Sequence, residues 1–93
     1  MALFKVIKVF DGNTFQVDGW TWREHSGSLV RATGYYTPRL NEQYYFLPKQ
    51  KLEKLILHQR VELGNVHSYN NGILSCEVFI NGIPLWQYFP EYK

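Results

Sequence analysis

The chain has 93 residues, enough for a single small domain spanning 1–93. Its net charge is +2, well short of the basic balance of proteins that bind nucleic acid mainly through charge. A single cysteine excludes an internal disulfide and any multi-cysteine metal site. No apolar run is long enough to span a membrane, and the first residues lack a signal-peptide core. We therefore expect a soluble protein, although no feature of the chain indicates a cellular compartment.

Aromatic residues are unusually frequent, at 17% of the chain: seven Tyr, six Phe and three Trp. This content argues against disorder. It also exceeds what the core of so small a domain can hide. Some rings should therefore lie on the surface, where aromatic side chains form binding faces. The alternative is that they occupy half-buried strands, which favour Tyr and Trp.

The first half of the chain predicts three strands. Residues 3–10 are rich in β-branched and aromatic types, as strands are. Residues 11–13 read Asp-Gly-Asn, a typical tight turn. Residues 14–24 predict a second strand, 25–28 a turn and 28–34 a third strand.

The second half predicts one helix and two more strands. Pro48 can open a helix, because its missing N–H is not needed in the first turn. Residues 60–67 and 73–80 predict strands joined by a turn at 69–72, and 83–88 predict a short helix or turn. Three strands, a helix and two strands indicate a mainly β (α+β) protein with one or two helices. This order is typical of a five-stranded Greek-key barrel of the OB type.

Two segments carry a composite motif. Residues 6–17 read Val-Ile-Lys-Val-Phe-Asp-Gly-Asn-Thr-Phe-Gln-Val, and residues 30–39 read Val-Arg-Ala-Thr-Gly-Tyr-Tyr-Thr-Pro-Arg. Their layout resembles the staphylococcal nuclease-like (thermonuclease-like) family, whose segments run V-x-D-G-D-T-x and R-L-x-G-[IV]-D-[TA]-P-E. The resemblance covers roughly residues 4–88 and implies a small OB-type barrel. The retained positions are Asp11, Gly12, Thr14, Arg31, Gly34, Thr37 and Pro38.

The acids of that pattern are replaced. Asn13 and Tyr36 stand where the resemblance implies carboxylate ligands of Ca²⁺, and Arg39 stands where it implies a glutamate base. A hard cation needs anionic oxygens, tyrosine is not ionised at neutral pH, and arginine cannot accept a proton. Asn71 replaces a second implied catalytic arginine. We therefore expect a nuclease homologue that has lost catalysis and binds no Ca²⁺, other metal or cofactor.

The remaining residues suit a bound anion. The resemblance implies that Arg31 clamps a phosphate, and a guanidinium can bond two phosphate oxygens at once. Arg39 would add a second cation, and Tyr36 and Tyr69 would offer rings on which bases stack. The plain alternatives are a turn tyrosine at Tyr69 and, at Arg31, an arginine that faces solvent or pairs with Glu24. The favoured ligand is single-stranded nucleic acid or another anion.

Two further functions are compatible with the sequence. A surplus of rings with modest charge also suits a surface for a protein partner or a homodimer. The rings concerned are Tyr35, Tyr36, Tyr44, Tyr45 and Phe46. A residual or rewired Ca²⁺-dependent phosphodiesterase would instead have to use Asp11, Asp18 or Glu24 with a metal. The three histidines show no zinc-binding spacing.

Overall fold

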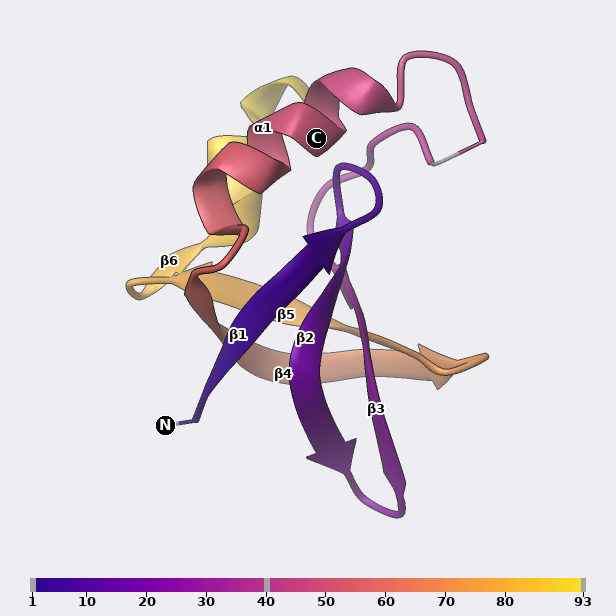
Figure 1. The fold of residues 1–93 in the computed structure, drawn as a ribbon, viewed down its shortest axis with the longest axis vertical. Helices are drawn as coiled ribbons and strands as arrows, with labels where there is room; N and C mark the ends of the chain where they lie inside the picture. The colour runs from indigo at the N-terminus through magenta and orange to yellow at the C-terminus, as the bar shows by residue number, and fades with distance from the viewer. Residues whose placement is uncertain (1, 40, 93) are drawn as a thin grey trace.

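The computed structural model describes residues 2–39 and 41–92, so Met1 and Lys93, the ends of the predicted domain, and Leu40 lie outside the described residues. The described chain is mainly β, with one α-helix (Figure 1). Its strands are β1 Leu3–Val9, β2 Thr14–Trp22, β3 His25–Ala32, β4 Arg60–Asn70, β5 Ile73–Ile80 and the short β6 Ile83–Pro84. Its helices are α1 Phe46–Ile56 and the 3₁₀ turns η1 Leu85–Tyr88 and η2 Pro90–Tyr92. None of the described helices is long and apolar enough to cross a membrane.

Five of the strands close into a barrel. Antiparallel pairs join β1 to β2 and β4, β2 to β3, and β4 to β5. A parallel pairing of β3 with β5 completes the ring in the order β1-β2-β3-β5-β4. Closure leaves these strands without the unpaired edges of an open sheet. The predicted mainly β barrel of five strands with a helix is confirmed.

The core follows from the alternation of each strand. Every second side chain of a strand points to the same face, so apolar residues at alternate positions fill the barrel. Helix α1 closes one end with Leu52 and Ile56, which lie four residues apart on one helix face and are fully buried. Figure 1 shows α1 and the C-terminal turns together at that end, beside the turn between β1 and β2. The fully buried strand residues are Val6, Phe15, Val17, Val30, Val61 and Cys76.

Two predicted turns are wrong in position. Strand β3 already begins at His25, so the turn predicted at 25–28 is strand, and the hairpin turns instead at Arg23 and Glu24. Strand β4 continues to Asn70, so the next turn is shorter than predicted. Helix α1 begins at Phe46, two residues before Pro48. The β4–β5 hairpin is thus longer than its sequence pattern indicates, whereas β2 ends at Trp22, two residues before its predicted end.

An aromatic cluster lies where these two hairpins end. It consists of Trp20, Trp22, His25 and Tyr69, and it joins the ends of the β2–β3 and β4–β5 hairpins. The His25 ring stacks on Tyr69 with centroids 4.2 Å apart, and Trp20 meets Tyr69 edge-on at 5.8 Å. Trp20 Nε1 also donates to the Leu29 carbonyl at 3.0 Å. Because these rings pack on each other, strand pairing continues past the limits of the barrel core.

Candidate functional site

The turn between β1 and β2 is held by its own aspartate. Asp11 Oδ1 accepts hydrogen bonds from the backbone N–H groups of Asn13 and Thr14, at 3.0 and 2.8 Å. Asp11 is 3% exposed. Aspartate commonly bonds the backbone two or three residues ahead in this way. The carboxylate that the sequence left as a possible metal ligand is therefore engaged in shaping the turn.

Glycine is required at the next position of the turn. A Cβ atom on Gly12 would lie 2.6 Å from Pro48 Cβ and 2.7 Å from Thr37 Oγ1. No side chain fits there without displacing the start of α1 or the segment after β3. The Thr37 hydroxyl is buried at this contact and has no hydrogen-bond partner in the structure. Gly12 and Thr37 of the motif are thus explained by close packing of the turn.

Arg31 lies on the outer face of β3. Its neighbours in register are Thr14 on β2 and Ser75 on β5. Arg31 Nε donates to Thr14 Oγ1 at 3.2 Å, and Thr14 Oγ1 donates to Asn13 Oδ1 at 3.2 Å. These bonds connect residues from both motif segments. The bond to Thr14 uses the Nε–H of Arg31, one of the five N–H donors of a guanidinium.

The second arginine lies close enough to affect the first. Burial lowers the pKa of Arg31, and the charge of Arg39 lowers it further, while Asp11 raises it. Arginine still stays protonated in proteins. No ion pair to either arginine is found within residues 2–39 and 41–92, so Arg31 does not pair with Glu24. Two cations that form no ion pair within the described chain, and are only partly offset by Asp11, favour a bound anion.

Two hollows open around these arginines, and both are lined by Arg31 and Arg39. The first hollow has a volume of about 340 Å³. The second hollow has a volume of about 240 Å³. The first is lined by Asn13, Arg31, Ala32, Thr33, Gly34, Tyr35, Tyr36, Arg39, His67 and Ser75. The second is lined by Phe10, Asp11, Thr14, Leu29, Arg31, Arg39 and Asn41.

Four of the six residues singled out from the sequence meet at the first hollow: Asn13, Arg31, Tyr36 and Arg39. Tyr36 is 84% exposed, so its ring is accessible to a ligand. Its backbone N–H donates to the Tyr92 carbonyl at 2.8 Å, which ties this residue to η2. These four residues therefore line one hollow, although Asn13 and Arg39 are 26 positions apart in the chain.

The other two residues lie elsewhere. Tyr69 belongs to the aromatic cluster, and Asn71 forms the β4–β5 turn with Gly72, where both have positive φ, 53° and 81°. Asn and Gly are the residues that tolerate this conformation. Neither Tyr69 nor Asn71 lines either hollow. The longer β4 moves them away, so Tyr69 does not share a ligand site with Tyr36.

His67 enters the site although the sequence analysis did not select it. In the β4–β5 register Val66 pairs with Cys76 and Ser68 pairs with Ser75, so His67 is an extra residue in β4. Such a bulge changes the direction of a side chain and is frequent beside functional sites. His67 and Ser75 both line the first hollow. The one sequence signal was that His67 falls where the resembled family has an aspartate, two residues before Tyr69.

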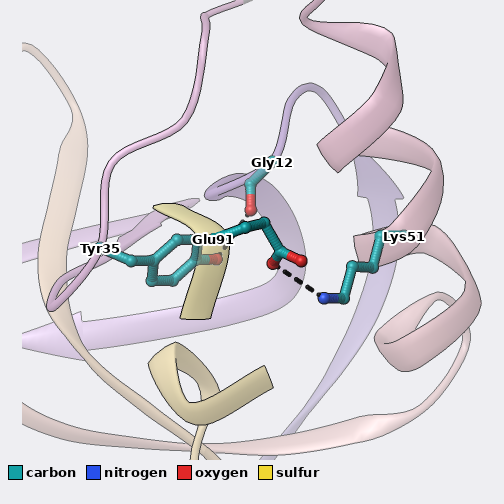
Figure 2. Close-up of polar contacts among 4 residues, drawn as sticks. All are labelled: Gly12, Tyr35, Lys51 and Glu91. Carbon is teal, nitrogen blue, oxygen red and sulfur yellow. Dashed lines mark hydrogen bonds and ion pairs between the residues drawn. The ribbon is translucent and has the colours of Figure 1, made fainter. Parts of the chain in front are cut away.

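Tyr35 connects the turn to the C-terminal segment. Its hydroxyl donates to the Gly12 carbonyl at 2.7 Å (Figure 2). Its ring stacks on Phe89 with centroids 4.6 Å apart. Lys51 Nζ lies 4.7 Å from the centre of the Phe89 ring. It also forms an ion pair with Glu91 Oε1 at 3.0 Å (Figure 2). Burial raises the pKa of Tyr35, followed by the effect of Asp11, so the phenol stays a donor at physiological pH. Tyr35 therefore links the β1–β2 turn to Phe89 near the C-terminus.

The donor set does not suit a divalent cation. Calcium needs several anionic or carbonyl oxygens. Asp11 is the one carboxylate that lines either hollow within the described residues, and it already accepts two backbone hydrogen bonds. Arg31 and Arg39 would repel a cation there. No cluster of three His, Cys, Asp or Glu residues that could hold a metal occurs in the described chain.

Comparison with protein-family models, curated proteins and solved structures returned no match. What the site does must therefore be inferred from its own chemistry. That chemistry consists of two unpaired cations, an accessible ring and two adjoining hollows on a closed barrel.

Proposed function

We propose that this protein is a nuclease-like OB-fold domain that binds single-stranded nucleic acid, or a similar phosphate-bearing ligand, without hydrolysing it. The proposal is carried by one observation: Arg31 and Arg39 line both hollows and have no ion-pair partner within the described chain. Guanidinium groups bind phosphate oxygens through directed, charge-assisted hydrogen bonds. Tyr36 stands beside them with its ring accessible, as stacking on a base requires.

The fold supports the OB-type assignment. The barrel order β1-β2-β3-β5-β4, with α1 between β3 and β4, suits a five-stranded barrel of that type. The resemblance to staphylococcal nuclease-like proteins gains support from the site itself. Thr14 comes from the first motif segment and Arg31 from the second, and the two side chains are hydrogen-bonded. Two segments matched separately in sequence thus meet at one place.

The loss of hydrolysis is proposed from the residues that remain. Phosphodiester hydrolysis needs a metal or a general base to activate water. Asp18 and Glu24, which the sequence offered for a rewired enzyme, are exposed and line neither hollow. Asp11 lines the second hollow, but its carboxylate is engaged by the turn. Binding without cleavage is therefore the better-supported activity.

The test is a titration of labelled single-stranded DNA and RNA at several salt concentrations. The logarithm of the binding constant should fall linearly with the logarithm of the salt concentration, with a slope of about −0.7 per phosphate contacted in a single strand. Arg31→Ala should weaken binding and make the slope of this plot less negative by about 0.7, because one phosphate contact is removed. Arg31→Lys is the matched control, since it keeps the charge but loses the bidentate geometry. Undetectable binding at low salt would contradict the proposal.

The same samples decide the question of catalysis. Oligonucleotide incubated with the protein and Ca²⁺ should stay intact. Cleavage that needs Ca²⁺ and disappears in Arg31→Ala would instead identify a residual phosphodiesterase.

One observation favours a second candidate function, binding of a protein partner or a second copy. Three large apolar residues around the start of α1 are exposed: Tyr44 at 61%, Phe46 at 46% and Leu47 at 53%. Exposed apolar patches often mark interaction surfaces. Size-exclusion chromatography that shows a stable dimer, together with no affinity for oligonucleotides, would favour this function over the first.

A further inference from the structure

The two hollows lie on opposite sides of one arginine. Arg31 stands in register between Thr14 of β2 and Ser75 of β5. Thr14 lines the second hollow and Ser75 lines the first. Arg39 also lines both. The arginine pair therefore occupies the boundary between two adjoining spaces, rather than the closed end of a single pocket.

The two hollows differ in chemistry. The first offers polar groups from Asn13, His67 and Ser75. The second is lined by the apolar side chains of Phe10 and Leu29, both half-buried, so part of each remains open to a ligand. Flat, largely apolar groups such as nucleobases pack well against aromatic and aliphatic side chains.

The shared arginine pair gives both hollows a net positive charge. Asp11 also lines the second hollow and offsets part of that charge, while its Oδ1 atom accepts two backbone N–H groups and shapes the turn. Among the described residues no other acid lines either hollow. An anionic group is therefore best placed at the boundary, with uncharged parts of the ligand extending to both sides.

We infer that the site binds an internal phosphodiester, with the phosphate on Arg31 and Arg39, one nucleoside in the first hollow and its neighbour in the second hollow against Phe10 and Leu29. This inference rests on the proposed function and deepens it, because it names a dinucleotide unit as the smallest complete ligand. A nucleotide with a terminal phosphate fills one hollow only. A phosphodiester fills both, since it carries a nucleoside on each side.

Two ligands with a single phosphate each distinguish the alternatives. A mononucleotide phosphate carries up to two negative charges at neutral pH, whereas a dinucleotide with one internal phosphodiester carries one. Charge alone therefore ranks the mononucleotide first. If both hollows are occupied, the dinucleotide should bind about tenfold or more tightly than the mononucleotide, which is the effect expected from one additional stacked base. NMR titration measures both affinities and locates the contacts, with shifts at the Phe10 and Leu29 amides expected for the dinucleotide.

Variants of the second hollow test its role directly. Leu29→Trp fills the hollow, so the preference for the dinucleotide over the mononucleotide should be lost. Leu29→Met is the matched control, because it keeps an apolar side chain of similar volume and should preserve the preference. Asn41→Trp closes the same hollow from an exposed loop position, so the test does not depend on packing in β3.

The outcomes separate this inference from the proposed function. Mononucleotide binding that depends on Arg31, with no gain for the dinucleotide, would overturn the inference and leave the anion site in place. An unchanged dinucleotide preference in both tryptophan variants would also overturn it. If neither small ligand nor any oligonucleotide binds, both proposals fail.

Discussion

The arginine site and the aromatic cluster show how similar residue types serve opposite purposes. Tyr69 is half-buried among the rings of Trp20, Trp22 and His25. Tyr36 lies beside two cations and is 84% exposed. In the sequence the two tyrosines were equivalent candidates for stacking on a base. Their neighbours distinguish them, because the interactions of Tyr69 are made within the protein, whereas the ring of Tyr36 remains available.

The two regions should also differ in how much they contribute to the stability of the fold. Each aromatic pair contributes about 0.5–1.5 kcal/mol beyond its burial, so the aromatic cluster should stabilise both hairpins. The arginines of the site form no ion pair in the described chain, and the charge of Arg39 opposes that of Arg31, so they should add little to stability. Substitutions in the aromatic cluster should therefore lower stability and spare binding, and substitutions at the arginine site should do the reverse.

The largest effect should come from Trp20. Trp20→Ala should lower the free energy of unfolding by about 3–5 kcal/mol, as expected for truncation of a buried large ring. Trp20 is 3% exposed and also donates to the Leu29 carbonyl. Urea denaturation measures the change. Trp20→Phe keeps a ring but loses that hydrogen bond and part of the indole's packing, so it should be destabilised less than Trp20→Ala and still bind oligonucleotide. Lost binding in folded Trp20→Phe would show that the two regions are coupled.

Substitutions of the two tyrosines should have smaller effects, and each should change a different property. Tyr36→Ala should weaken oligonucleotide binding by about 1–3 kcal/mol, the range for loss of one stacked base. Tyr69→Ala should leave affinity unchanged and lower stability, because its ring partners are inside the protein. Parallel binding titrations and thermal melts make the comparison. Equal losses of affinity in the two variants would contradict the separation of the sites.

The smallest effect should come from one hydroxyl that braces the site. Tyr35→Phe keeps the stack on Phe89 and loses the hydrogen bond to the Gly12 carbonyl, so stability should fall by about 0.5–1.5 kcal/mol. Affinity should also fall, since the turn is less well held, but the salt slope should stay unchanged. Tyr44→Phe removes an exposed hydroxyl and is the control. A reduced salt slope in Tyr35→Phe would mean that this residue contacts phosphate indirectly.

Tyr35 also predicts a pH dependence. Burial raises the pKa of its phenol, so the folded protein holds this proton more tightly than the unfolded chain does. In the unfolded chain the tyrosine pKa is about 10. Its contribution to stability is therefore complete below about pH 10 and declines as the pH rises further. Alkaline destabilisation should be smaller in Tyr35→Phe, and thermal melts across this range measure it.

Predictions from the sequence succeeded where the information is local. The strands β1 and β5 and the turn at residues 11–13 were found because alternation and turn residues act over a few positions. The hairpin ends were misplaced, because Tyr69 stays in β4 through its contacts with His25 and Trp22. These contacts join segments more than 40 residues apart, and no local pattern contains them.

The amino-acid sequence by itself determined the order of strands and helix, the tight turn at Asp11 and the replacement of acids by Asn13, Tyr36 and Arg39. Only the tertiary structure decided that β3 pairs with β5, that a bulge brings His67 to the site, and that two hollows share one arginine pair. The physical reason is that secondary structure depends on neighbours along the chain, whereas barrel closure and cavity shape depend on packing between strands distant in sequence.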